Sequence, residues 1–252
     1  MSSRGGQSGR AVRRAAVIVV TAAVALALPG ILIGNGLWLL MNDWYVHVEY
    51  ARPAFPDDRY GFTKAERTEL AIVGLRSIQP QHGEGVELLR RARLPDGSPA
   101  FTEAEIKHMD DVRSLVGILL RFSLVGLAVI LVLAIASRLG YVRGFLPRAL
   151  FAGSLFTLVA GSVLGVVMLI DFDWFFTQFH LALFEGWTWY FRYEDTLLRL
   201  YPDVFWSDFA IVLTVLVFLQ AFLLGGGAWW WRRRSRANQV TPVPSRDPQP
   251  SS

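Results

Sequence analysis

Four long apolar segments constrain the fold of this chain more than any other feature. They cover residues 15–41, 114–137, 149–170 and 209–231. Each has at least the ~20 residues that a helix needs to cross ~30 Å of hydrocarbon. Inside a bilayer only helices and closed barrels satisfy every backbone polar group. We therefore predict an all-α integral membrane protein, with one membrane domain of four transmembrane helices over residues 15–234.

The distribution of charge predicts how the chain crosses the membrane. Basic residues precede the first apolar segment, separate the second from the third and follow the fourth, and Asp247 is the only acid in these stretches. They include Arg4, Arg10, Arg13, Arg14, Arg138, Arg143, Arg148, Arg232, Arg233, Arg234 and Arg236. Because positive segments stay cytoplasmic, we predict an N-in/C-in topology, a basic cytoplasmic N-terminus at 1–14, and extracytoplasmic loops at 42–113 and 171–208. The pI of about 9.7 reflects this topology, so no nucleic-acid partner is expected.

The two ends of the chain differ in composition. The first apolar segment follows basic residues, as in a signal peptide, but it is longer than the ~7–15 residues of a signal h-region. We therefore predict an anchor that is not cleaved. Residues 235–252 are rich in proline, serine and glutamine, and we predict a disordered cytoplasmic tail there.

Two polar side chains interrupt the apolar segments. Asn35 lies between Gly34 and Gly36, where it either forms a hydrogen bond between packed helices or lines a site. Arg121 lies about one or two turns inside the second segment, where a charge must pair or reach water. It either extends to the outer interface or pairs with a polar head group or a carboxylate. The carboxylates considered are Asp171, Asp173 and Glu185.

Two capping boxes predict where helices begin in the first extracytoplasmic loop. They are Thr63-x-x-Glu66 and Thr102-x-x-Glu105, in which the hydroxyl and the carboxylate each accept a hydrogen bond from the other residue's backbone N–H. No helix-breaking residue occurs between Glu103 and the second apolar segment. We therefore predict one continuous helix that rises out of the membrane.

His108 lies on the part of this helix outside the membrane. It precedes the apolar segment by about six residues, or ~9 Å at ~1.5 Å per residue. Glu105 and Asp111 lie three residues to either side, on nearly the same helical face. Either carboxylate is therefore a candidate for orienting the imidazole.

A second histidine, His180, lies in the aromatic stretch 171–192. Rings with one polar edge collect at the boundary between membrane and water. At helical spacing four polar residues of the stretch share one face, and they are Asp173, Thr177, His180 and Thr188. We therefore predict an interfacial amphipathic helix with a polar stripe that contains His180.

The residue types exclude several kinds of chemistry. The chain has no cysteine, which excludes disulfides, thiolate metal sites and cysteine nucleophiles. It has neither a Gly-x-Ser-x-Gly elbow nor a phosphate-binding glycine loop. His108 and His180 lack the spacing of metal ligands on one helical face, so we predict no metal and no cofactor. His47 and His82 have no comparable setting and are predicted to be surface residues.

The residues alone leave three functions open. A polar pocket with two histidines at the outer membrane surface suits proton transfer to a lipid-linked substrate, because an imidazole exchanges protons near neutral pH. The alternatives are a non-catalytic lipid- or lipoprotein-binding membrane protein and a small transporter component. Catalysis requires His108 and His180 to lie about 3–7 Å apart, with one substrate atom or water between them. A transporter requires a polar cavity at the bilayer midplane.

Three segments carry a resemblance to a known family. FTEAEIKHMDDVRSL at 101–115, FDWFFTQFHLALFEGWTWYF at 172–191 and LYPDVFW at 200–206 resemble the bacterial membrane family that includes the lipoprotein intramolecular transacylases (Lit). The resemblance implies an acyltransferase of the bacterial cytoplasmic membrane whose active site faces the extracytoplasmic side. Its partners would be membrane lipids and a diacylglyceryl lipoprotein, whose sn-2 acyl chain moves to the cysteine α-amine to give the lyso form.

The same resemblance assigns residues. It implies that His108 and His180 are the catalytic pair, with His108 as base and His180 as acid or oxyanion donor, or the reverse. The neighbouring polar residues are orienting or substrate-contacting candidates. They are Glu105, Asp111, Arg121, Asp173 and Glu185.

Overall fold

The fold is that of a multi-pass membrane protein, as the apolar segments predict. The computed structural model describes residues 4–139 and 144–237. Four of its helices contain a stretch long and apolar enough to cross a membrane, and they are α1 (Arg4–Leu40), α5 (Glu103–Arg138), α6 (Leu146–Ile170) and α9 (Asp203–Ala237). No β-strand occurs in the described residues. The structure thus confirms the all-helical membrane fold.

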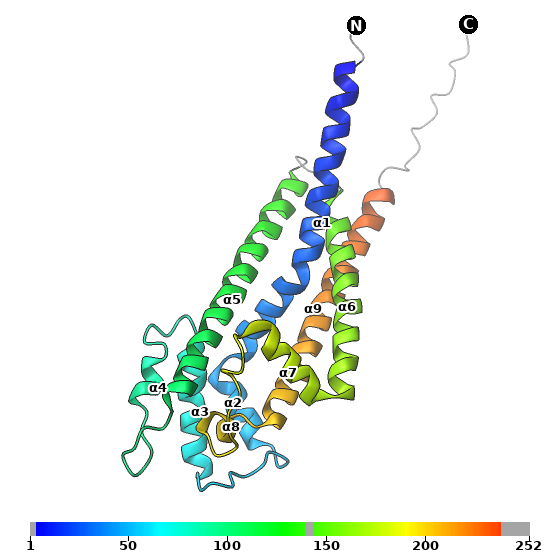
Figure 1. Cartoon of the computed structure of the whole chain (residues 1–252). Coiled ribbons are helices and arrows are strands. Elements are labelled where there is room, and N and C mark those ends of the chain that lie inside the picture. The colour runs from blue at the N-terminus through cyan, green and yellow to red at the C-terminus, as the bar shows by residue number, and fades with distance from the viewer. Residues whose placement is uncertain (1–3, 140–143, 238–252) are drawn as a thin grey trace, which may run out of the picture.

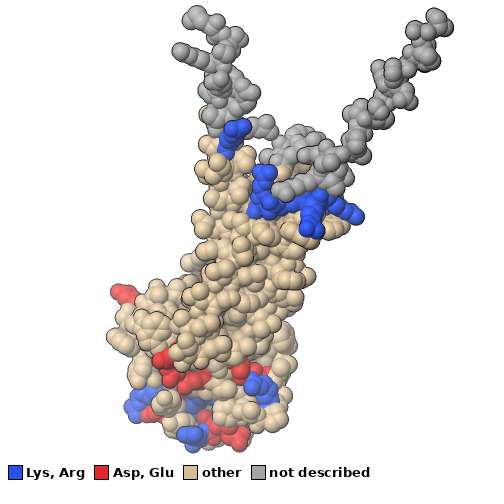
Figure 2. Space-filling model, turned by 90° about the vertical axis from the view of Figure 1, so that its right-hand side faces the viewer, with Lys and Arg blue, Asp and Glu red and all other residues tan. Residues whose placement is uncertain are grey.

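The shorter helices gather at one end of the four-helix bundle (Figure 1). They are α2 (Asp43–Ala51), α3 (Lys64–Ile78), α4 (Glu87–Arg91), α7 (Phe172–Leu183) and α8 (Thr196–Leu200). We call these helices and their connecting segments the head. The start of α1 and the end of α9 both lie at the opposite end of the bundle, and α1 extends beyond α9 (Figure 1). Arginines gather at that end, an uncharged belt follows, and both signs of charge mix on the head (Figure 2).

Small residues bring α1 and α5 into close contact. A Cβ added at Gly34 would lie 2.6 Å from the Cβ atom of Ser123, so only glycine fits at this crossing. The hydroxyl of Ser123 donates a hydrogen bond of 2.8 Å to the backbone carbonyl of Ile31. This contact fixes the helix that carries His108 against the centre of the bundle.

Asn35 packs two membrane helices together. Its side-chain amide donates to the side-chain oxygen of Gln220 on α9 at 2.5 Å. Gln220 in turn donates to the backbone carbonyl of Leu216 at 3.1 Å. The structure therefore favours the packing role of Asn35 over a role in lining a site.

Both predicted capping boxes are present. Thr63 and Glu66 open α3, and Thr102 and Glu105 open α5, with the side chain of each residue bonded to the other's backbone N–H. From Glu103, α5 continues without a break into the membrane, as predicted. Its outer part is therefore a rigid extension of a membrane helix.

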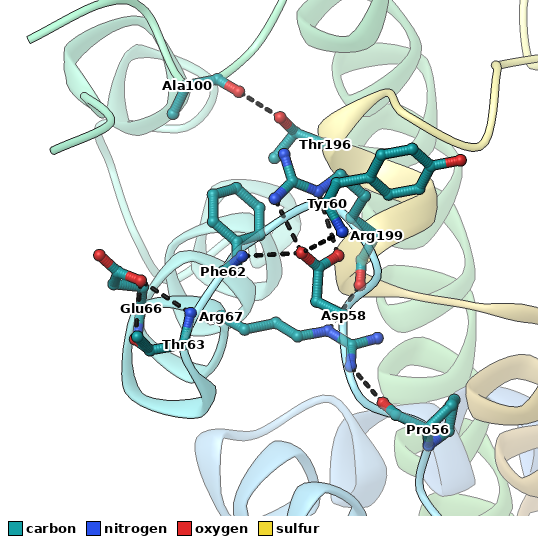
Figure 3. A network of polar contacts seen from close by, with 10 residues as sticks. All are labelled: Pro56, Asp58, Tyr60, Phe62, Thr63, Glu66, Arg67, Ala100, Thr196 and Arg199. Atoms are coloured by element: carbon teal, nitrogen blue, oxygen red, sulfur yellow. Dashed lines mark hydrogen bonds and ion pairs between the residues drawn. The ribbon is translucent and has the colours of Figure 1, made fainter. Parts of the chain in front are cut away.

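A buried ion pair holds the first loop of the head to α8 (Figure 3). The carboxylate of Asp58 accepts from the guanidinium of Arg199 at 2.9 Å and from the backbone N–H of Phe62 at 2.8 Å. Arg67, also buried, donates to the carbonyl oxygens of Pro56 at 2.5 Å and Arg199 at 2.6 Å. Loop and helix α8 thus form one unit, although they are far apart in sequence.

The aromatic stretch 171–192 is only partly helical, which corrects the prediction of one helix across it. The helix ends at Leu183. Gly186 then adopts a φ of +60°, a left-handed conformation that glycine tolerates best. The turn folds Trp189 back, and its indole N–H donates to the carbonyl of Gly186 at 3.1 Å. Thr188 therefore lies outside the helix and does not belong to the predicted polar stripe.

The C-terminal boundary also differs from the expectation. Helix α9 continues to Ala237, three residues into the predicted tail 235–252. The rest of that predicted tail lies outside the described residues.

Candidate active site

The head brings His108 and His180 together. His108 lies near the start of α5 and His180 lies on the last turn of α7, and each is only 8% exposed. Their ring centroids are 6.2 Å apart. This separation lies within the predicted range of about 3–7 Å, so the two rings converge as predicted.

Aromatic rings form the walls around the pair. The ring of Phe184 lies 5.0 Å from that of His108 and 5.5 Å from that of His180. Phe191 lies 5.5 Å from His108. Phe176 and Trp189 lie 4.0 and 4.7 Å from His180. The imidazoles are therefore held between apolar surfaces that limit access of water.

One hydrogen bond determines the tautomer of His180. Its Nδ1 lies 2.8 Å from the backbone carbonyl oxygen of Phe176, one helical turn earlier. Because a carbonyl only accepts, Nδ1 must carry the proton, and the neutral ring then has its lone pair on Nε2. His180 therefore presents a basic nitrogen.

Burial also favours the neutral imidazole. It lowers the pKa of His180 below its ordinary value, and the hydrogen bond to Phe176 offsets only part of that effect. The Nδ1 of His108 is buried without a hydrogen-bond partner in the described residues. A charged ring would need such a partner, so the packing around His108 also disfavours the imidazolium.

The candidate acids do not pair with the imidazoles. Glu105 is buried, but its carboxylate accepts from the backbone N–H and hydroxyl of Thr102 and from the backbone N–H of Leu197. The side chains of the other three candidates are exposed, and in residues 4–139 and 144–237 none bonds to either histidine; they are Asp111, Asp173 and Glu185. The structure thus assembles the histidine pair but places these four carboxylates elsewhere.

Arg121 turns toward the outer end of its helix. Its guanidinium nitrogens lie within 3.4–3.5 Å of the position that a Cβ would occupy on Gly117, one turn nearer the head. In the described part of the chain it forms no ion pair with Asp171, Asp173 or Glu185. This position is that of an arginine extending from a membrane segment to the interface.

The remaining histidines lie away from the pair. His47 is exposed on α2, and His82 is partly exposed in the loop after α3. Within the described ranges, no group of three or more His, Cys, Asp or Glu side chains is arranged to hold a metal ion.

Sequence reasoning missed the aromatic walls as part of the site. The spacing of Phe176, His180 and Phe184 at four-residue steps is a signal that places them along one helical direction. No such signal exists for Phe191 or Trp189, because they reach the site only through the turn at Gly186.

Four membrane helices with a buried histidine pair at one end define the class: a multi-pass membrane protein whose candidate site lies where the bundle meets the head. The family model "Lipoprotein intramolecular transacylase Lit" matches residues 37–206. The chain belongs to the lipoprotein intramolecular transacylase family. Membership supports, in general terms, lipoprotein intramolecular transacylase activity.

Individual relatives agree with this family. An uncharacterized protein of Aquifex aeolicus (strain VF5) is 32% identical over 206 residues, which cover 82% of this chain and 91% of the relative. The structure of the membrane integral lipoprotein intramolecular transacylase Lit from Bacillus cereus matches with a TM-score of 0.71 at 16% identity, covering 88% of this chain and 98% of that one. A structure of the same protein with a histidine replaced by alanine has a TM-score of 0.69 at 16% identity, covering 91% and 99% of the two chains.

Proposed function

We propose that this protein moves the sn-2 acyl chain of a diacylglyceryl-cysteine lipoprotein to the α-amine of the same cysteine, using His108 and His180 as acid–base groups. The observation that carries the proposal is the pair of buried imidazoles with ring centroids 6.2 Å apart. The family matched by residues 37–206 supplies the class of reaction.

His180 is the better base. Its Nδ1–H is engaged by Phe176 O, so the lone pair of Nε2 is available. A free α-amine has a pKa near ~7.7–8.0, so a usable fraction is neutral at pH 7. As the amine nitrogen attacks the sn-2 ester carbonyl, Nε2 of His180 takes one of its protons. Of the two orders that the family resemblance leaves open, this assignment is the one in which His180, and not His108, is the base.

His108 then stabilises the oxyanion that forms on the ester carbonyl oxygen. A neutral imidazole N–H can donate a hydrogen bond to the oxyanion of the tetrahedral intermediate. When the bond between the carbonyl carbon and the sn-2 oxygen breaks, the proton held by His180 passes to that oxygen. The products are an amide and a free glyceryl hydroxyl, and no proton or water is gained or lost.

Positioning supplies much of the acceleration. Amine and ester belong to one molecule, so holding them together replaces a bimolecular encounter, and such effects reach ~10⁵ M or more in effective concentration. The ring walls formed by Phe176, Phe184, Trp189 and Phe191 suit this task, because they hold the imidazoles in place and limit competing hydrolysis.

The proposed site faces the extracytoplasmic side of the bacterial cytoplasmic membrane. The arginines at the end opposite the head support this orientation, since positive segments remain cytoplasmic (Figure 2). Four arginine side chains there stack on aromatic rings, as interfacial anchors do; they are Arg138, Arg232, Arg233 and Arg234. The lipoprotein substrate and membrane lipids would reach the histidines at head-group depth.

Mass spectrometry of a co-expressed diacylglyceryl lipoprotein tests the proposal. The wild type is expected to convert its N-terminal peptide to the N-acyl, S-monoacylglyceryl form. His108→Ala and His180→Ala are each expected to slow conversion by ~10²–10⁴-fold, the usual worth of a general acid or base. His47→Ala, which removes an exposed histidine from the same head, is the matched control and should convert normally.

Two outcomes would contradict the proposal. If His180→Ala retains the wild-type rate, the histidine mechanism fails. If the folded, inserted wild type leaves the amine free, the protein is better described as a non-catalytic lipoprotein-binding member of its family.

A further inference from the structure

Glu105 has two different kinds of partner. Its Oε2 accepts from the backbone N–H and hydroxyl of Thr102, at 2.7 and 2.9 Å, and this is an ordinary capping box. Its Oε1 accepts from the backbone N–H of Leu197 at 2.7 Å, 92 residues away. The side chain is fully enclosed, with 1% of the residue exposed. Glu105 therefore does more than begin α5.

The bond to Leu197 joins the start of α8 to the start of α5. A second bond runs beside it, from the hydroxyl of Thr196 to the carbonyl of Ala100 at 2.5 Å (Figure 3). A carboxylate forms stronger hydrogen bonds than a neutral acceptor, especially where water is excluded. Of the two links, the one to Glu105 is therefore the stronger.

The segment that precedes α8 covers the histidines. Residues 184–195, here called the aromatic cover, connect α7 to α8 and carry Phe184, Trp189 and Phe191. One end of the cover is continuous with the helix of His180. The other end is held by Glu105, which lies one turn before His108 on α5.

We propose that Glu105 is a positioning residue for the transacylation: through Leu197 it holds the aromatic cover against both imidazoles. The inference rests on the proposed function of the histidine pair. Without the bond, the start of α8 keeps the Thr196 link and the Arg199 ion pair, but the end of the cover is held less firmly against α5, and the wall formed by Phe191 and Trp189 admits water.

The chain supplies a matched control for the test. Glu66 forms the same capping box with Thr63, at 2.8 Å to its N–H and 2.7 Å to its hydroxyl, but among the described residues it has no hydrogen bond to a distant segment. Glutamine has one carbonyl oxygen where glutamate has two accepting oxygens. Glu66→Gln and Glu105→Gln therefore weaken equivalent capping boxes, and only Glu105→Gln also disturbs the bond to Leu197.

The expected result is a change in rate and in its pH dependence. Glu105→Gln should lower kcat about tenfold with KM within about twofold, because a bond to a charged group is lost while substrate contacts remain. As water reaches His180, the pKa of its imidazole should rise toward the ordinary ~6.5. Since the base must be neutral, the acid limb of the pH–rate profile moves to higher pH. Glu66→Gln should leave kcat and the limb unchanged.

A second variant and a second readout keep the test decisive. Thr196→Val removes only the parallel bond and should shift the limb in the same direction by a smaller amount. NMR titration of labelled histidine, assigned with His180→Ala, reads the pKa of His180 without any turnover. Wild-type kcat and an unshifted His180 pKa in folded Glu105→Gln would overturn the positioning role. Activity surviving in His180→Ala would instead overturn the proposed function.

Discussion

Replacing Asp58 with asparagine should destabilise the head more than any exposed ion-pair change. Asp58 is 2% exposed at its side chain, and its partner Arg199 is 11% exposed. The carboxylate accepts from Arg199 at 2.9 and 3.1 Å and from the backbone N–H groups of Phe62 and Tyr60 at 2.8 and 3.0 Å. Asparagine keeps one acceptor oxygen but has no charge to balance the guanidinium.

The magnitude follows from burial. Removing one partner of a buried pair costs ~3–5 kcal/mol, because the remaining charge stays uncompensated. Arg199 also lies over the ring of Phe62, 3.4 Å from its centroid, and keeps that cation–π contact in the variant. We therefore expect the lower value, about 3 kcal/mol. For a chain of this size, ~1 kcal/mol shifts Tm by ~2–4 °C, so Tm should fall by ~6–12 °C.

Thermal unfolding in detergent is the assay, with Asp43→Asn as the control. Asp43 pairs with Arg76 in the same head, but these side chains are 34% and 47% exposed. Exposed pairs contribute ~0–1 kcal/mol, so the control should lose at most a few degrees. Equal Tm values for the two variants would refute the reasoning that burial sets the cost.

Acidification supplies an independent check on Asp58. Burial opposes ionisation, but the hydrogen bonds from Arg199, Phe62 and Tyr60 outweigh it and lower the pKa of the carboxyl group. A lowered native pKa contributes stability above the unfolded value of ~3.9, and that stability is lost as pH falls through the native pKa. The difference in stability between wild type and Asp58→Asn should therefore narrow below pH ~4.

Two further predictions concern the membrane helices. Asn35 and Gln220 are replaced with leucine, singly and together, in a double-mutant cycle measured by thermal unfolding. The expected coupling energy is ~0.6 and at most ~1.7 kcal/mol. Zero coupling would show that their 2.5 Å hydrogen bond contributes nothing to stability. Gly34→Ala should lower the free energy of unfolding by ~1–3 kcal/mol, because its Cβ would lie 2.6 Å from that of Ser123. In the control Gly165→Ala the new Cβ meets no atom within 4 Å, so the stability should not change. Equal Tm values for the two variants would contradict the close α1–α5 crossing.

Local features of the sequence predicted the helices well. The apolar length of α1, α5, α6 and α9 depends only on consecutive residues, and a capping box such as Thr102 and Glu105 spans four positions. Such signals act within one helical turn or one span. Neither requires knowledge of what packs against the helix.

The aromatic stretch shows where local signals fail. Helical spacing predicted that Thr188 continues the face of His180, but the chain turns at Gly186 so that Trp189 can pack on the imidazole. Phe191 likewise packs on His108. This contact joins residues of separate elements, so no sequence periodicity predicts it.

Glu105 illustrates the same limit for a single side chain. Its spacing from His108 predicted a contact along one helix face. The carboxylate instead bonds to Leu197, because folding places the start of α8 against the start of α5. A buried N–H group without an acceptor costs free energy, so a buried carboxylate accepts from the N–H groups that would otherwise be unpaired. Only the assembled head determines which N–H groups these are.

The sequence by itself determined that this chain crosses the membrane with four helices, and its arginines predicted which ends lie together. It also placed one histidine on each of two segments near the same membrane face. The tertiary structure alone decided that His108 and His180 meet at 6.2 Å between aromatic walls, and that the cover folds back so that Phe191 and Trp189 reach the two rings. Hydrophobic length and charge are properties of short segments, whereas the distance between two rings on different helices depends on how every contact between those helices is satisfied.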